Sequence, residues 1–382
     1  PMLHPGKLAA ALAAKQPDLR QATRHQADDL SRLRQVLARW AAVSQTELER
    51  ALDAIPWPGA LPTTEQDTQP VLVPFAPQWP NHHQARTWAR EVLKGVTTFA
   101  ADGSHLAPDG ELALPVGLIQ VGWFENRHQP QGDYTKDVSL ELLAAPDLTT
   151  PAAIDWRRFR GELAQLEAFM TRQAGQPAVA FFDGSLIGSF LQNIPPTQRR
   201  PYLVQIEQLL AVSEETQVPV VAYIDQSHAR DLSDMLAHLG QLQPHGWVSD
   251  PLLLQALMPG WGSRARFFRC ARQDRYLAAT QRRYYRRVLF TYLQTGSRRP
   301  PVRLELPDWV LDRGRHEWVL NIIRAECVVG LGYPYPLEAA DAVAVLTRQD
   351  RARFLATLQV LAAELELPAT VSAKAVSKRR RR

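Results

Sequence analysis

The chain has 382 residues, of which 45% are hydrophobic, so it is long enough to bury one large core or two modest ones. Two cysteines are too few for a disulfide framework, and no run approaches the roughly 20 apolar residues of a membrane span, so a cytoplasmic protein is expected. The net charge of +5 equals the charge of the five basic residues at 378–382, which leaves the rest of the chain neutral.

The N-terminal part predicts helices followed by a proline-rich connection. Apolar residues at helical spacing between 17 and 55 predict one long helix or two shorter ones. Seven prolines from Pro56 to Pro80 then predict an extended strap without regular structure. Residues 1–85 are therefore expected to form a helical arm outside the sheet.

Three apolar runs each end in an aspartate: 96–101 before Asp102, 178–182 before Asp183, and 218–224 before Asp225. Continuous apolar residues bounded by turn residues predict buried strands, each delivering a carboxylate to its C-terminal edge. Neighbouring strands of this kind bring the carboxylates together, and Mg²⁺ or Mn²⁺ is the ion that such oxygens bind. The simplest alternative is that Asp-Gly-Ser, which follows two of the runs, is only a turn.

The remaining elements complete a mixed α/β pattern. Strands at 112–123 and 138–143 are expected to form a hairpin after the first aspartate run. Helices at 154–174 and 197–214 separate the aspartate runs, and this alternation predicts parallel strands. Further expected elements are helices at 84–94, 229–242, 317–328, 337–346 and 351–366, a short helix within 246–258, and strands at 288–293 and 302–306.

Residues 264–287 form a strongly basic block, with nine arginines and one acidic residue, Asp274. Aromatic residues alternate with these arginines, as in proteins that hold phosphates with guanidinium groups and stack rings on bases. A solvated charged surface is the alternative. The residues expected to bind DNA are Arg264, Arg266, Arg269, Arg272, Arg282, Arg283, Tyr284, Arg286 and Arg287.

Several motifs occur in an order that resembles the NurA nuclease family over roughly residues 90–350. They are Asp102-Gly103-Ser104, an acidic helix, Asp183-Gly184-Ser185-Leu186, the segment 303–309, and the segment from Gly332-Tyr333-Pro334 to Asp341. The resemblance implies an RNase H-like mixed sheet flanked by helices, with an N-terminal helical appendage. It places a nuclease domain at 86–366, with the basic block at 264–287 as a DNA-binding insert, and a basic disordered tail at 367–382.

The resemblance also implies site residues. Asp102 and Asp183 resemble the family's first and second metal-binding aspartates, and Glu162 its helical glutamate, with Glu167 as the alternative. Tyr333 would orient water or stack on a nucleotide. The best-known members have a histidine where this chain has Asp341, and an aspartate there keeps an oxygen ligand for a hard cation but removes an imidazole.

A role without metal binding is the alternative for Asp225. It ends the third apolar run, but with Ser227 and His228 it could shape the pocket without touching a metal ion. A histidine beside a strand end is more often an ordinary polar contact than a ligand.

The implied activity is divalent-metal-dependent DNA cleavage with two Mn²⁺ or Mg²⁺ ions per site. The resemblance further implies a homodimer that acts as a 5′-to-3′ exonuclease and single-strand endonuclease. Its implied partner is a HerA-type hexameric ATPase, with which it would resect the ends of DNA double-strand breaks. Two alternatives stay open at this point: a non-catalytic DNA-binding adaptor of the translocase with a degenerate site, and another Mg²⁺-dependent phosphoryl-transfer enzyme.

Overall fold

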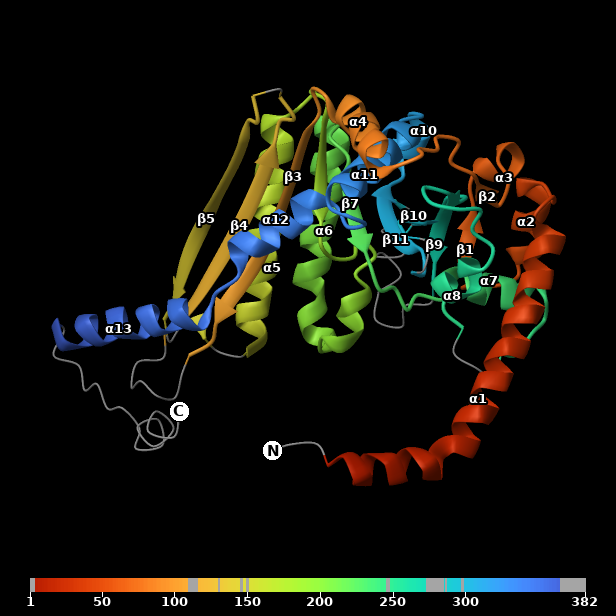
Figure 1. Cartoon of the computed structure of the whole chain (residues 1–382), viewed down its shortest axis with the longest axis horizontal. Coiled ribbons are helices and arrows are strands. Elements are labelled where there is room, and N and C mark those ends of the chain that lie inside the picture. Colours follow the sequence, from red (N-terminus) through yellow and green to blue (C-terminus); the bar gives the residue numbers. More distant parts are fainter. Residues whose placement is uncertain are drawn as a thin grey trace. The chain divides into compact units, whose positions relative to one another are not determined.

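The chain forms two compact units, each assembled from two separate stretches of sequence (Figure 1). One unit comprises Pro1–Gln78 and Ile224–Asp308, and the other Trp79–Tyr223 and Trp309–Arg382. The computed structural model describes residues 4–108, 116–129, 131–144, 147–148, 151–244, 248–272, 285, 287–296 and 299–364. The N-terminal residues thus fold together with a stretch from the second half of the chain.

The unit that contains Trp79–Tyr223 has a mixed sheet in the order β7-β6-β3-β4-β5. The strands are β3 Thr97–Leu106, β4 Gly117–Asn126, β5 Tyr134–Leu143, β6 Ala178–Phe182 and β7 Val220–Ile224. β3, β4 and β5 form an antiparallel meander, whereas β6 lies parallel to β3 and β7 parallel to β6. This arrangement confirms the predicted RNase H-like mixed sheet.

Helices flank this sheet, and α5 and α12 pack directly on its strands. The helices of this unit are α4 His82–Leu93, α5 Pro151–Arg172, α6 Arg199–Thr216, α10 Trp309–Asp312, α11 His316–Val329, α12 Tyr335–Ala344 and α13 Arg348–Glu364, with 3-10 turns at Ser189–Asn193 and Pro196–Gln198. α5 buries Leu163, Leu166 and Met170 completely, which is the i, i+3, i+7 stripe expected of a helix on a sheet. Phe169 of α5 stacks on Phe99 of β3 with ring centroids 4.5 Å apart.

The other unit contains smaller strands and the N-terminal helices. Its elements are α1 Pro5–Trp40, α2 Gln45–Leu52, β1 Gly59–Pro62, α3 Glu65–Thr68, β2 Leu72–Val73, α7 Asp231–Leu239, α8 Asp250–Gln255, β8 Arg264–Ala265, β9 Phe268–Ala271, β10 Val288–Leu293 and β11 Val302–Pro307. β1, β9, β10 and β11 pair antiparallel in that order, and β8 joins β10 to β2.

The prediction of a strap without regular structure at 56–80 was wrong. This segment contributes β1, α3 and β2. Proline is compatible with β1 because that strand lies at the edge of its sheet and Pro62 is its last residue, so no central ladder hydrogen bond is lost.

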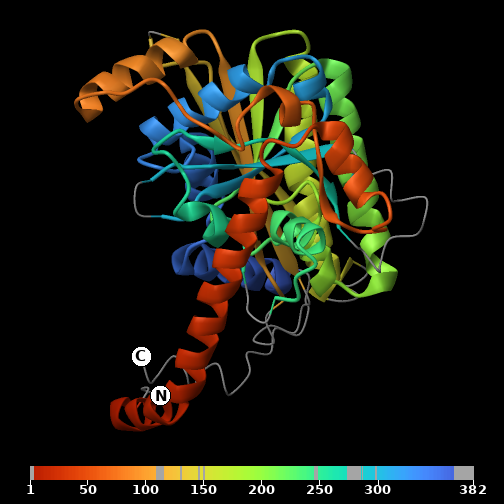
Figure 2. The same cartoon turned by 90° about the vertical axis from the view of Figure 1, so that its right-hand side faces the viewer.

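The predicted N-terminal helices are present. α1 buries Leu33, Val36 and Leu37 near its C-terminal end, where it contacts α7 and α8. Toward its start Leu12 and Leu19 are exposed, and Figure 2 shows this part of α1 extending away from α7 and α8. In the described part of the chain, every helix is too short or too polar to cross a lipid bilayer.

Candidate active site

The register of β3 against β6 brings Asp102 and Asp183 to the same level of the sheet. The last parallel pair is Ala101 with Phe182, and each aspartate follows its member of that pair directly. Asp183 lies just beyond the end of β6, as predicted. Asp102 differs from the prediction: it lies inside β3, because the pairing with β4 continues to Leu106 after the pairing with β6 has stopped.

The glycine and serine of the second Asp-Gly-Ser element shape the turn after β6. A Cβ atom on Gly184 would lie 2.4 Å from the ring of Phe182, so only glycine fits where the chain folds back over that ring. The Ser185 hydroxyl accepts a hydrogen bond from the Ser189 amide at 3.3 Å, which holds the following 3-10 turn. The turn alternative thus explains Gly184 and Ser185, but it assigns no role to the exposed Asp183 carboxylate.

Glu162 reaches the site from α5 through close contact with β3. A Cβ atom on Gly103 would lie 2.5 Å from Glu162 Oε1, and one on Gly161 would lie 2.9 Å from Val121 of β4. These two glycines therefore let α5 approach the sheet closely, with the Glu162 side chain buried against the β3 backbone.

Asp341 comes from α12, which packs on β3 and β4 and crosses them in Figure 1. Gly122 of β4 is paired with Asp102, so both positions face the same side of the sheet. A Cβ atom on Gly122 would lie 2.7 Å from the Ala344 backbone nitrogen, which places α12 on that side and α5, at Gly103, on the other. Gln120 fixes the end of α12 by donating to the Val343 and Ala344 carbonyls.

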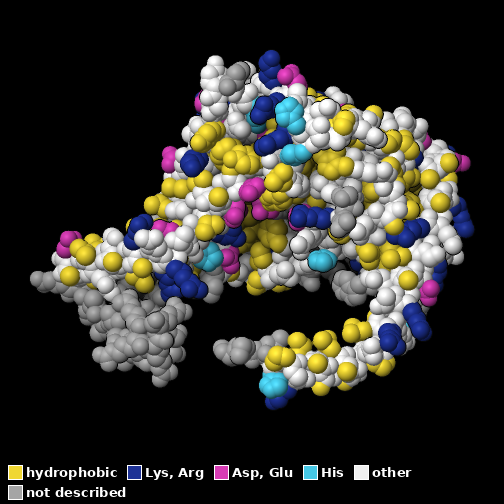
Figure 3. All heavy atoms as spheres, viewed as in Figure 1, with side chains coloured by type: hydrophobic (Ala, Val, Ile, Leu, Met, Phe, Trp, Pro, Cys, Tyr) yellow, Lys and Arg dark blue, Asp and Glu magenta, His cyan; other side chains and the backbone are white. Residues whose placement is uncertain are grey.

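The carboxylates influence one another electrostatically. Burial raises the pKa of Asp102, and a hydrogen bond and like charge from Asp341 raise it further, against the opposing effects of the Gly103 amide and Arg158. Burial also raises the pKa of Glu162 to about 8, with the charges of Asp102 and Asp183 adding to the effect and Arg158 opposing it. Four carboxylates from β3, α5, the end of β6 and α12 are thus coupled in one region, and Figure 3 shows acidic side chains gathered over α12.

These residues fit a hard divalent cation in donor chemistry. All four supply oxygen, and a cation would offset the burial and like charge that raise the pKa of Asp102 and of Glu162. Among the described residues, however, no three Asp, Glu, His or Cys side chains already converge as a closed metal cage. In this state, Arg158 holds the Glu162 carboxylate in an ion pair of 2.6 Å.

The structure distinguishes Glu162 from Glu167. Glu167, five positions later on α5, accepts hydrogen bonds from Gln205 and Gln208 of α6 and so lies between two helices.

Tyr333 packs edge-on against Tyr223 of β7, with ring centroids 5.2 Å apart.

Asp225 is exposed just beyond the end of β7. His228 is likewise exposed, and the Ser227 hydroxyl accepts from the Ala229 amide. The metal roles of Asp102, Glu162, Asp183 and Asp341, the role of Tyr333 and that of Asp225 all stay predictions.

Two arginines of the basic block are buried structural residues. Arg264 is fully buried and makes a bidentate ion pair with Glu65, in which its Nη1 and Nη2 atoms donate to the carboxylate at 2.8 and 2.6 Å. Arg266, 5% exposed, donates to Gln66 and to the carbonyls of Ala41 and Gln69. The expectation that these two bind DNA was wrong, because their guanidinium groups are already engaged inside the fold.

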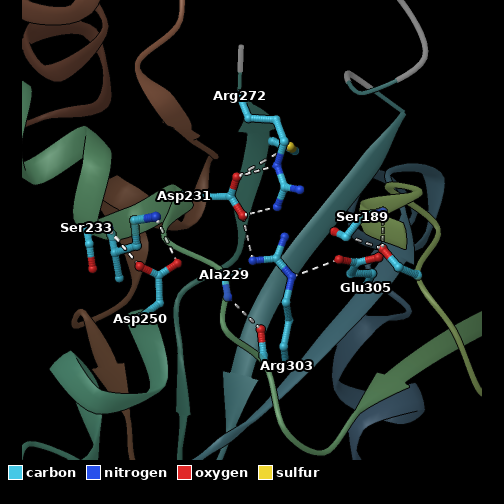
Figure 4. A network of polar contacts seen from close by, with 12 residues as sticks. Ser189, Ala229, Asp231, Ser233, Asp250, Arg272, Arg303 and Glu305 are labelled. Atoms are coloured by element: carbon cyan, nitrogen blue, oxygen red, sulfur yellow. Dashed lines mark hydrogen bonds and ion pairs between the residues drawn. The ribbon is translucent and has the colours of Figure 1, made fainter. Parts of the chain in front are cut away.

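Arg272 belongs to a buried ion network (Figure 4). Asp231 accepts from Arg272 at 2.7 and 2.8 Å and from Arg303 at 2.8 Å, and Arg303 also donates to Glu305. The two arginines lower the pKa of Asp231 to about 2, although burial alone would raise it. The Arg303 and Glu305 of the motif at 303–309 therefore stabilise the core of this unit, and the pairing of Arg272 makes a phosphate-binding role unfavourable.

Of the remaining arginines, Arg269 and Arg287 are partly exposed and stay candidates for DNA contact. Arg282, Arg283, Tyr284 and Arg286 lie outside the described residues. So does the predicted tail at 367–382.

Sequence reasoning missed Arg158 and Gly122. Arg158 could have been found, because it precedes Glu162 by four residues on a predicted helix and such residues are neighbours on a helix surface. Gly122 gave no signal, since its close contact with α12 joins segments that are far apart in the sequence.

A mixed sheet that carries coupled carboxylates from its strands and covering helices defines an α/β protein of the RNase H-like class. Within that class, the chain belongs to the NurA family: residues 96–346 match the NurA domain. The four carboxylates all lie within the matched residues. No sequence among the curated proteins matches the chain significantly.

The chain is also similar in structure to solved proteins. A crystal structure of NurA with manganese is 11% identical, with a TM-score of 0.43, over 71% of this chain and 90% of that one. A NurA structure bound to dAMP and manganese is 9% identical, with a TM-score of 0.35, over 66% and 85%. The catalytic domain of human endonuclease V is 14% identical, with a TM-score of 0.33, over 75% and 95%.

Proposed function

We propose that this NurA family protein is a divalent-metal-dependent DNA nuclease. The observation that carries the proposal is the coupling of the Asp102, Glu162, Asp183 and Asp341 carboxylates across both sides of one sheet. A protein gains nothing in stability from holding like charges together in a half-buried place, so such clusters are typical of functional sites.

The four carboxylates would hold Mn²⁺ or Mg²⁺, with two ions per site as the family resemblance implies. When bound, the cation would supply an activated water molecule and neutralise the charge that develops on the leaving oxygen. The chain's own contribution is placement. β3 and β6 fix Asp102 and Asp183 at one level, α5 fixes Glu162 through Gly103, and α12 brings in Asp341.

Cleavage of a phosphodiester in this way needs no nucleophilic side chain. The proposed role of Tyr333 is to orient water or stack on a nucleotide. Arg269 and Arg287 would contribute phosphate contacts, because both are partly exposed arginines in the basic block.

The finer features of the function rest on the family resemblance. They are 5′-to-3′ exonuclease and single-strand endonuclease activity, end resection with a HerA-type hexameric ATPase, and a homodimer. Exposed apolar side chains along the edge strand β5, at Val138, Leu140 and Leu142, are compatible with a protein interface. Light scattering reports the oligomeric state directly.

The test is to replace the paired aspartates one at a time. Asp102→Asn or Asp183→Asn should lower the rate of linear DNA cleavage in Mn²⁺ by at least about a hundredfold, because each removes a charged ligand of the cation. DNA binding and the melting temperature should change little. Asp137→Asn on the exposed edge strand β5 is the matched control and should cleave like the wild type.

Two outcomes would replace the proposal. Hydrolysis of a generic phosphomonoester but not of DNA would favour another phosphoryl-transfer enzyme. DNA binding without Mn²⁺ binding in calorimetry would favour the adaptor alternative.

A further inference from the structure

Arg158 is the positive charge that faces the carboxylate cluster from α5. Its Nη1 donates to Glu162 Oε1 at 2.6 Å and to the Gly103 carbonyl at 3.2 Å. It also lowers the pKa of both Asp102 and Glu162, so its charge acts on more than its direct partner. The side chain is 32% exposed, which leaves part of it open to solvent.

The guanidinium group is only partly used by these contacts. Both hydrogen bonds leave from Nη1, while a guanidinium carries five N–H donors. In the described ranges of the chain, Nε and Nη2 of Arg158 make no hydrogen bond to protein. Two N–H groups side by side are the pattern that binds two oxygens of one phosphate.

The neighbouring Arg157 shows what a purely structural arginine looks like on this helix. Its two Nη atoms are each committed, one to Glu141 at 2.6 Å and the other to Asp147 at 2.5 Å. Neither partner belongs to the carboxylate cluster. Arg157 and Arg158 thus share a helix and a side-chain type but differ in whether donors remain available.

We propose that Arg158 binds the DNA backbone and exchanges partners when the site is loaded. Without a metal ion, its charge balances Glu162. With a divalent cation held by the carboxylates, Glu162 would no longer depend on Arg158 as its counter-charge, and the guanidinium group would be free to hold a phosphate beside the one that is cut. This inference rests on the proposed nuclease function and adds a substrate-contacting residue to it.

The exchange predicts opposite effects on metal and DNA. Arg158→Met keeps an aliphatic side chain against Gly103 but removes the charge. Mn²⁺ affinity, measured by calorimetry, should rise about tenfold, because a competing charge-assisted hydrogen bond is lost. In Mn²⁺, Arg158→Met should bind a cleavage-resistant phosphorothioate oligonucleotide more weakly than the wild type. The slope of log K against log salt should also become shallower, by the amount expected for the loss of about one phosphate contact. In EDTA the salt dependence should stay unchanged, because the charge of Arg158 is then balanced by Glu162 rather than by a phosphate.

Arg157→Met is the matched control and should alter neither Mn²⁺ affinity nor the salt dependence. The inference about Arg158 is overturned if Arg158→Met leaves Mn²⁺ affinity unchanged or lowers it, or if the salt dependence changes equally in Mn²⁺ and EDTA. A melting temperature close to that of the wild type shows that Arg158→Met is folded. If Arg158→Met unfolds the protein, Arg158→Lys, which keeps the charge, replaces it. Arg158→Lys should keep the slope of log K against log salt but bind the phosphorothioate oligonucleotide more weakly, and binding equal to that of the wild type overturns the inference. Failure of the wild type to bind Mn²⁺ or cleave DNA rejects the nuclease proposal itself, which is a different result.

Discussion

Replacing Gly122 by alanine should lower the DNA cleavage activity while the protein stays folded. The new Cβ atom would lie 2.7 Å from the Ala344 backbone nitrogen and 2.9 Å from two atoms of Val343, where ordinary contacts begin at 3.4 Å. α12 must therefore move away from β4 by about 0.7 Å. Asp341 lies on the same helix, one turn earlier, so it moves away from Asp102.

The expected effect of Gly122→Ala on the cleavage rate is larger than its effect on stability. Overpacking of this kind costs about 1–3 kcal/mol in the free energy of unfolding, which a chain of this size can tolerate. Displacing a catalytic group by about 1 Å can lower a rate about a hundredfold. We therefore expect Gly122→Ala to remain folded at 25 °C in a urea titration, while DNA cleavage in Mn²⁺ falls by about ten- to a hundredfold.

The contact geometry supplies a control. Val343→Ala alone should cleave DNA at nearly the wild-type rate, because it leaves the helix in place. Combining it with Gly122→Ala should restore little activity, since the closest atom is the backbone nitrogen of Ala344 rather than the Val343 side chain. Wild-type cleavage by Gly122→Ala, or full recovery in the double variant, would refute the reasoning that α12 positions Asp341.

Two further predictions concern the buried ion pairs of the unit that contains the N-terminal helices. Glu65→Ala leaves the Arg264 charge buried without its partner and should lower the free energy of unfolding by about 3–5 kcal/mol in a urea titration. Glu65→Leu combined with Arg264→Met should recover most of this loss, because no charge then stays buried. Equal stability of the single and double variants would contradict this prediction. Because the pKa of Asp231 in the folded state is about 2 and that of a free aspartate about 3.9, its ionised form contributes stability above pH 4 that is lost as the pH falls toward 2. The difference in melting temperature between wild type and Asp231→Asn should therefore shrink below about pH 4, and a difference that stays constant down to pH 2.5 would exclude this role.

Local patterns were sufficient for most of the secondary structure and for the principal carboxylates. The run at 178–182 is a strand because five apolar residues are buried on both faces, and the helix that carries Glu162 follows from its apolar spacing. The strap at 56–80 was mispredicted because its short strands are stabilised by partners about 200 residues away, which local composition does not show.

The sequence by itself determined the family, the alternation of strands and helices, and which acidic residues follow buried strands, because each of these depends on residues close together in the chain. Only the tertiary structure decided which side chains act together. It placed Asp341 beside Asp102, turned Arg264 inward to Glu65 across 199 positions, and left Arg158 with donors to spare. A charge in a sequence has the same appearance whether it is buried or exposed, and its role is fixed only by the partner that folding brings to it.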